Sequence, residues 1–202
     1  MGESMKNFLT EAFNNAQNYF RELKTFKAAY KQLKADVDAG NTAGILSGLE
    51  KTKDSRFMDR DKFDDLLQRT LESDNLASFN ALMTTQPGPN YYFEHTSSNG
   101  TLTIASKQHV LTRAIILNAE KIALNLARNP AIVVDQPGHS HTHHSARYSS
   151  VPTEFTEQYP LPVDAAKKKG MTALHAILET KTKIAIARKR IADKKKGNGA
   201  GT

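Results

Sequence analysis

The sequence predicts a mostly α-helical protein made of stacked helical pairs, with a long N-terminal helix and one short β-hairpin. Three observations predict this class. Apolar residues recur at alternating steps of three and four over residues 5–38, helical periods return in later parts of the chain, and only short segments are rich in β-forming residues. The 202 residues suit one domain, or one domain with an appendage. Because the chain has no Cys, disulfide frameworks, iron–sulfur ligation and thiol catalysis are excluded.

The first predicted segment, residues 1–40, is one long amphipathic helix. Its apolar stripe consists of Leu9, Ala12, Ala16, Tyr19, Leu23, Phe26, Tyr30, Leu33 and Val37. Gly40 and Asn41 provide a stop signal. A two-helix coiled coil favours aliphatic residues along its seam, whereas this stripe holds three aromatic residues and is widened by Phe13 and Phe20. We therefore expect the helix to pack on the body of its own chain, and the alternative is a homodimer through this helix.

The second segment, residues 41–135, is predicted to be a helical body. Ser73-Asp74 is the expected N-cap of one of its short helices, and another helix is expected over residues 107–128. Between these helices, Asn99-Gly100 separates two runs of β-forming residues, which is typical of a β-hairpin. Helices joined by a tight turn must lie antiparallel or at a steep angle, so helical pairs are expected here.

The third segment, residues 136–163, is predicted to be an insert or loop, because four Pro and many Ser and Thr residues replace the apolar period. It contains four closely spaced histidines, His139, His141, His143 and His144. Neutral imidazoles coordinate zinc, copper or nickel, and a spacing of two places alternate rings on one side of an extended chain. Since the surrounding residues supply no second set of ligands, we expect only weak metal binding here and predict no cofactor.

The fourth segment, residues 164–196, is predicted to be a basic helical unit, followed by a disordered tail at residues 197–202. Residues 165–196 hold eleven Lys and Arg residues but only two acidic ones, which gives this stretch a charge of +9 and the rest of the chain −2. Such a cationic end attracts phosphate, anionic lipid or an acidic protein surface. The candidate partner-binding residues are the cations Lys181, Arg188, Lys189 and Arg190, which are expected to be exposed.

Residues 170–176 read Gly-Met-Thr-Ala-Leu-His-Ala and resemble the opening of an ankyrin repeat, whose signature is Gly-x-Thr-Pro-Leu-His-x-Ala. Residues 99–105 are a weaker copy of this pattern. The match is degenerate, because Ala173 replaces the turn proline and Lys181 stands where a glycine between the helices is expected. The resemblance implies helical pairs stacked in ankyrin-like fashion. The chain is also similar in this respect to small effectors that intracellular bacteria deliver into host cells.

The resemblance also implies roles for residues of the last helix. Leu174 should point into the core, and His175 should hydrogen-bond the adjacent turn. The inward side of the following helix should consist of Ile184, Ala187 and Ile191.

These features together predict a non-catalytic protein–protein interaction module, including the role of a bacterial effector that acts on a host protein. Stacked helical pairs offer a face whose side chains vary without disturbing the core. The first alternative is a binder of nucleic acid or anionic membrane through the basic end. The second is a metal-dependent hydrolase that uses the histidine cluster.

The expected location is the cytoplasm. No apolar run is long enough to span a bilayer, and the N-terminus lacks the apolar core of a secretory signal. The alternative is secretion into a host cell without a Sec signal.

Overall fold

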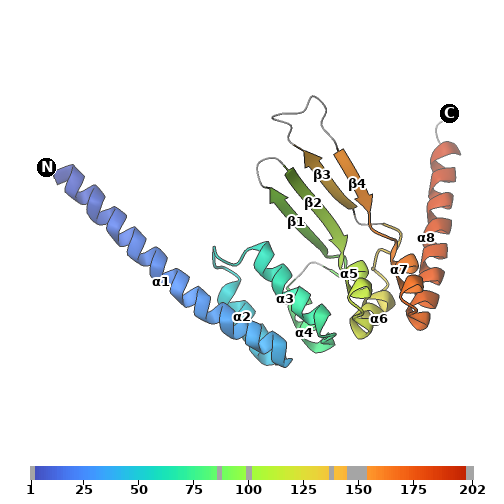
Figure 1. The fold of residues 1–202 in the computed structure, drawn as a ribbon, viewed down its shortest axis with the longest axis horizontal. Helices are drawn as coiled ribbons and strands as arrows, with labels where there is room; N and C mark the ends of the chain where they lie inside the picture. Colours follow the sequence, from blue (N-terminus) through green and yellow to red (C-terminus); the bar gives the residue numbers. More distant parts are fainter. Residues whose placement is uncertain (1–2, 86–87, 99–101, 137–138, 145–153, 199–202) are drawn as a thin grey trace. The chain divides into compact units, whose positions relative to one another are not determined.

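The structure is a computed structural model that describes residues 3–85, 88–98, 102–136, 139–144 and 154–198 (Figure 1). Its helices are α1 (Glu3–Ala39), α2 (Thr42–Thr52), α3 (Arg60–Glu72), α4 (Leu76–Met83), α5 (Val110–Ile116), α6 (Glu120–Arg128), α7 (Pro162–Lys168) and α8 (Thr172–Asn198). Its strands are β1 (Tyr92–Ser98), β2 (Leu102–His109), β3 (His139–His144) and β4 (Glu154–Gln158). The predicted mostly α-helical class is confirmed, as are the long N-terminal helix and the hairpin of β1 and β2.

The chain forms two compact units, residues 1–69 and 70–202, and the boundary lies inside α3. The predicted segments, which followed composition and charge, end at other places. The expected insert at residues 136–163 contains β3 and β4, and the expected tail begins too early because α8 continues to Asn198. Composition marks where the chain becomes polar, whereas a unit is defined by the residues that pack together.

Four pairs of helices share one turn geometry. The residue between the two helices of each pair has a positive φ, at Gly40 (72°), Asp74 (47°), Asn118 (61°) and Gly170 (70°). Its backbone N–H donates to the carbonyl three residues earlier, and the next N–H donates to the carbonyl five residues earlier. These two bonds close the end of a helix with one left-handed residue, so the chain turns directly into the next helix. The predicted helical pair is found at α3–α4, and the same turn also joins α1 to α2, α5 to α6 and α7 to α8.

Two local predictions are wrong because this turn has no strong sequence signal when its residue is Asp or Asn. The single helix predicted over residues 107–128 is two helices, α5 and α6, with Asn118 between them. The N-cap of α4 is not Ser73-Asp74. Asn75 caps this helix, since its side-chain oxygen accepts a hydrogen bond from the Ser78 N–H at 3.0 Å.

The first unit is held together where α2 and α3 pack on the second half of α1. Its buried apolar side chains are Phe26, Leu33, Val37, Ile45, Leu49, Phe63, Leu66 and Leu67. The Tyr30 hydroxyl on α1 donates to the Asp65 carboxylate on α3 at 3.0 Å. Burial raises the pKa of Asp65, but this bond, together with Lys34 and Arg69, outweighs burial and holds the pKa below its usual value.

Close packing of α2 on α1 depends on Gly48. A Cβ atom at this position would lie 2.9 Å from Cδ1 of Leu33, a side chain with no exposed surface. Elsewhere in a helix, Gly→Ala is stabilising by about 1 kcal/mol. Here we expect Gly48→Ala to destabilise the first unit by about 1–3 kcal/mol, because overpacking a core outweighs helix propensity.

Urea denaturation followed by circular dichroism measures this effect. Ser47→Ala, at the neighbouring exposed position of α2, is the matched control. Its free energy of unfolding should equal that of the wild type or be slightly higher. A Gly48→Ala variant as stable as Ser47→Ala would show that α1 and α2 do not need this close approach.

The helix pairs of the second unit stack in chain order. The first helices α5 and α7 are in contact, and α6 contacts both α4 and α8. The largest fully buried side chains of this stack are Leu71, Phe79, Leu82, Leu111, Ile115, Ile122, Leu174 and Leu178. The Asp74 carboxylate accepts from the Lys121 and Ile122 N–H groups at 3.0 and 3.1 Å, which links one turn to the next pair. The resemblance assigned such a link to His175, whereas the structure gives it to Asp74.

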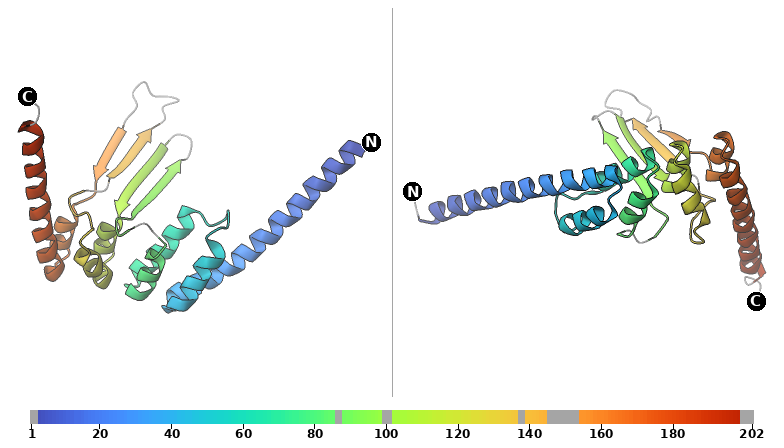
Figure 2. Two further views of the ribbon diagram at one scale, coloured as in Figure 1. Left: turned by 180° about the vertical axis from the view of Figure 1, so that it is seen from behind. Right: turned by 90° about the horizontal axis from the view of Figure 1, so that it is seen from below.

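The chain forms β1 and β2 between α4 and α5, and β3 and β4 between α6 and α7. These strands make one four-stranded antiparallel sheet in the order β1-β2-β3-β4 (Figures 1 and 2). Tyr92 on β1 is paired with His109 on β2, and Ala105 on β2 is paired with His141 on β3. The predicted hairpin is therefore half of a larger sheet. Its predicted turn, Asn99-Gly100, lies outside the described residues.

The segment that resembles an ankyrin opening occupies a different place from the one expected. Gly170 is the turn residue within the pair α7–α8, so residues 170–176 open the second helix of a pair rather than the first. Helix α7 was not predicted as a separate helix, because its sequence crosses the limit between the Pro-rich segment and the basic helical unit. Pro162 lies at the start of this helix, where a missing N–H costs nothing.

Candidate functional site

The cations predicted to bind a partner all lie on α8. Arg188, Lys189 and Arg190 are exposed, as predicted. Consecutive helical residues are rotated by about 100° from one to the next, so these three side chains point in three directions and cannot meet one flat surface together. Only Arg188 shares a side of the helix with Ile184 and Ile191, which are four and three residues away.

Lys181 differs from the prediction, because it is half-buried. Its ammonium group donates to the backbone carbonyl of Asn129, the residue that ends α6. Removal from water lowers the pKa of Lys181. A positive charge is favourable at the C-terminus of a helix, so Lys181 fixes α8 to α6 and has a structural role.

The apolar side chains of the second half of α8 are exposed, contrary to the prediction. Ile184 is 46% and Ile191 57% exposed, and Ala187 is exposed as well. The neighbouring helices α6 and α7 are too short to cover more than the first half of α8, where Leu174 and Leu178 are fully buried. No element among the described residues covers one side of this helix, and we call this side the α8 face: Ile184, Ala187, Arg188, Ile191 and Lys194.

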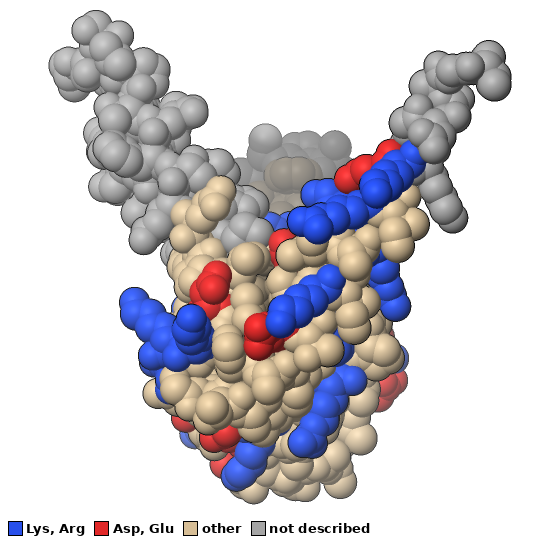
Figure 3. Space-filling view, turned by 90° about the vertical axis from the view of Figure 1, so that its right-hand side faces the viewer, with Lys and Arg blue, Asp and Glu red and all other residues tan. Residues whose placement is uncertain are grey.

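On the side of the molecule that Figure 3 shows, the charges of the described residues do not form one continuous patch. In the view toward this helix, Lys and Arg side chains are separated by uncharged surface and by acidic side chains (Figure 3). Nucleic-acid binding depends on several cations that neutralise neighbouring phosphates. The α8 face instead combines two cations with two exposed isoleucines, which suits an apolar groove with an acidic rim.

The four histidines of the predicted metal cluster, His139, His141, His143 and His144, lie on β3. In the sheet, His141 is paired with Ala105 on β2 and with Thr156 on β4. The histidine side chains lie outside the part of the chain that the structure describes. Among the described residues, no group of three or more His, Cys, Asp or Glu side chains is placed to hold a metal ion. Metal binding at this cluster stays a prediction.

One buried histidine that the sequence analysis did not single out is His109, at the junction of β2 and α5. Its Nδ1 accepts from the Leu111 N–H at 3.2 Å and caps α5, so the proton is on Nε2, which lies 3.2 Å from Oδ1 of Asn90. The Asn90 side chain in turn bonds the Ala131 carbonyl and the Val133 N–H. Burial lowers the pKa of His109 to about 4, so the neutral ring is part of the scaffold.

A second exposed apolar surface lies on the first half of α1, which extends beyond α2 and α3 (Figures 1 and 2). We call it the α1 stripe: Phe8 (68% exposed), Leu9 (51%), Phe13 (62%), Tyr19 (41%) and Phe20 (66%). Its cover ends at Tyr19, whose ring centre lies 5.3 Å from that of Phe57 and 4.8 Å from the Arg56 guanidinium. The prediction that this helix packs on its own chain therefore holds for its second half alone.

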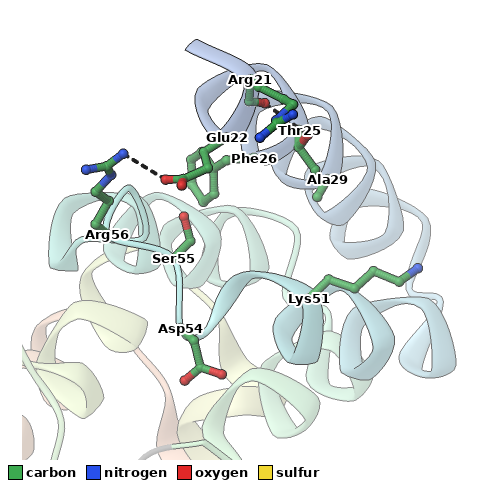
Figure 4. A pocket seen from close by; sticks show the side chains of 9 residues that line it. All are labelled: Arg21, Glu22, Thr25, Phe26, Ala29, Lys51, Asp54, Ser55 and Arg56. Atoms are coloured by element: carbon green, nitrogen blue, oxygen red, sulfur yellow. Dashed lines mark hydrogen bonds and ion pairs between the residues drawn. The ribbon is translucent and has the colours of Figure 1, made fainter. Parts of the chain in front are cut away.

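Beside the end of this cover, the first unit has an open groove of about 910 Å³ between α1 and the segment that joins α2 to α3 (Figure 4). Glu22 and Arg56 form an ion pair of 2.7 Å there. Lys51 and Asp54 point away from this pair (Figure 4). These lining side chains are thus paired or divergent, and they do not converge on one point as catalytic groups do.

Protein-family models, curated proteins and solved structures that were compared with this chain gave no match. The ankyrin resemblance stays a prediction. Among the described helices, none combines the length and the apolar character needed to cross a membrane.

Proposed function

We propose that the protein is a non-catalytic protein–protein interaction module that binds an acidic partner through the α8 face. The observation that carries this proposal is the exposure of Ile184 and Ile191 on either side of Arg188, on a helix whose first half is fixed in the core. Contiguous exposed apolar side chains mark interaction surfaces in soluble proteins. The helix would lie in a partner groove, with the isoleucines buried and the cations directed at acidic residues on the rim.

The stacked pairs α5–α6 and α7–α8 support the scaffold part of this proposal. A stack fixes the direction of α8 through Leu174, Leu178 and Lys181, so its exposed side is presented without a large loss of conformational freedom on binding. The role of an effector in a host cell is proposed from the resemblance alone.

The first test replaces the isoleucines of the α8 face. We expect Ile184→Ser with Ile191→Ser to reduce recovery of the partner more than tenfold, because each buried isoleucine contributes about 1.5–3 kcal/mol. The measurement is affinity capture from a nuclease-treated extract by the immobilised protein, with quantification of each recovered protein. Ile186→Ser is the matched control, since Ile186 is 45% exposed but lies on the opposite side of α8.

The polyanion alternative makes the opposite prediction. A nucleic acid or an anionic membrane would use the cations, and its binding would fall steeply with salt. Mixed-sequence DNA or acidic vesicles that bind the wild type and the Ile184→Ser/Ile191→Ser variant equally would favour this alternative. Equal recovery of every protein by this variant and by Ile186→Ser would contradict the proposed function.

A further inference from the structure

The α1 stripe has no covering element among the described residues, although the side of α1 that carries Phe8 and Tyr19 is buried further along the helix, at Phe26, Leu33 and Val37. Its five large apolar side chains, from Phe8 to Phe20, are between 41% and 68% exposed. A helical segment of this length is only marginally stable in water when nothing packs on it. The apolar period of the buried half continues without interruption into the exposed half, so the stripe has the pattern of a packing surface.

We propose that two copies of this chain pair through the α1 stripe, antiparallel and with a two-fold axis near residue 14. This inference is independent of the proposed function, because α8 belongs to the second unit. If the two copies do not pair, the function proposed for the α8 face is not affected.

Charge points to a second copy as the occupant. Between Asn7 and Phe20 the helix carries a single charged residue, Glu11, and its other polar residues are Asn, Gln and Thr. A helix that lies on an anionic membrane carries Lys and Arg on its polar side, and this segment has none. A strongly charged partner would find nothing to complement, whereas two nearly neutral copies approach without repulsion.

The range of exposed residues on α1 determines how the two helices are oriented in the pair. The exposed range from Phe8 to Phe20 is matched with itself in an antiparallel pair centred near residue 14. This places Leu9 opposite the partner's Tyr19, and Ala12 opposite the partner's Ala16. The small alanines allow the helix axes to approach closely near the centre, and aromatic side chains fill both ends.

A parallel pair does not fit the same surface. From Tyr19 onward, the side of α1 that carries Phe8 and Tyr19 is already covered by Phe57 and by the helices α2 and α3, although Phe20 on the adjoining side stays exposed. In a parallel pair both covers would lie at the same level and would force the two helices apart. In the antiparallel pair, each cover lies near the N-terminal end of the other α1.

The buried area is sufficient for a specific dimer. Each of the five large side chains of one copy can bury on the order of 100 Å² of accessible surface. The two copies together would bury roughly 1,000 Å². Specific interfaces begin at about this size.

Sedimentation over a range of concentrations tests the pairing. We expect the wild type to change from monomer to dimer, and Phe13→Asp with Phe20→Asp to weaken the dimer more than tenfold. Asn7→Asp with Asn14→Asp is the matched control: it adds two carboxylates at the same spacing on the opposite side of α1, and it should dimerise like the wild type. All four positions are exposed, so neither double variant removes packing inside the chain, and both should remain folded by circular dichroism. A wild type that stays monomeric at high concentration, or a dimer that survives Phe13→Asp/Phe20→Asp, would overturn the proposal.

Disulfide trapping tests the orientation. Because the 202 residues contain no Cys, only the introduced Cys residues can form a disulfide. In the antiparallel pair, Ala12→Cys and Ala16→Cys chains crosslink when mixed, and each variant alone does not, because only unlike positions come within reach. A parallel pair would crosslink each variant with itself and would overturn the proposed orientation.

Discussion

Lowering the pH from 7 to 4 should destabilise the second unit by on the order of 3 kcal/mol through His109 alone. The ring is almost fully buried and caps α5 in its neutral form. A proton on Nδ1 would face the Leu111 N–H, so a donor would meet a donor and the cap would be lost.

The direction follows from the two pKa values. Burial lowers the pKa of His109 in the folded protein from 6.5 to about 4, so the unfolded chain binds the proton more readily between these values. The stabilisation is complete above about pH 6.5 and is lost as the pH falls towards 4. Below about pH 4 the folded protein is protonated too, and His109 causes no further loss.

Nuclear magnetic resonance titration of the His109 ring protons measures the folded pKa directly. His109→Asn provides a stability control, because the Asn side chain is also an N-cap and does not titrate. The variant should be less stable at pH 7, and its difference from the wild type should shrink by about 2 kcal/mol at pH 5. Since the other six histidines are common to both proteins, they cancel in this difference. A His109 resonance that titrates near its ordinary value of 6.5 would contradict the prediction.

Asp74→Ala should destabilise the second unit by about 2–3 kcal/mol, for two separate reasons. The carboxylate accepts from two backbone N–H groups at the start of α6, where the N-cap residue Ala119 provides no side-chain cap. The residue also has a φ of 47°, a left-handed conformation that Asp tolerates better than Ala. The variant therefore loses the cap of one helix pair and strains the turn of another.

Two further variants separate these contributions. Asp74→Gly keeps the turn unstrained and removes only the cap, so it should cost less than Asp74→Ala. Asp74→Asn retains one acceptor oxygen and should be nearest to the wild type. Hydrogen exchange of the Lys121 and Ile122 amides, with urea denaturation for the total, measures the local and the global effect. Protection of these two amides that is unchanged in Asp74→Gly would show that the cap does not contribute.

The identity of the turn residues explains why some of these turns were predicted and others were not. Gly40 and Gly170 are ordinary signals for a left-handed residue, although Gly170 was assigned to the wrong end of a pair. Asp74 and Asn118 adopt the same conformation, but in a sequence these residues fit a cap or a helix surface equally well. Their roles became clear only from the hydrogen bonds that converge on each turn.

The candidate binding surfaces, too, were predicted only in part from the sequence. The sequence placed cations on the last helix correctly, but the rotation of α8 separates Arg188 from Lys189 and Arg190, and Lys181 is bound to Asn129. The isoleucines of α8 carry the helical period of a core, and so do the aromatic residues of the α1 stripe. A period shows that one side of a helix is apolar; it does not tell how far a neighbouring helix reaches.

Three properties could be predicted before any coordinates: the protein is mostly helical, α1 is long and amphipathic, and the positive charge is concentrated at the C-terminal end. These properties depend on residue type and local spacing, which a linear chain displays in full. Only the packing of the described residues shows that α1 and α8 are each covered over about half of their length, because this depends on the lengths of α2, α6 and α7 and on where they pack. For that reason the two surfaces proposed to bind partners are found where the helices extend past their neighbours.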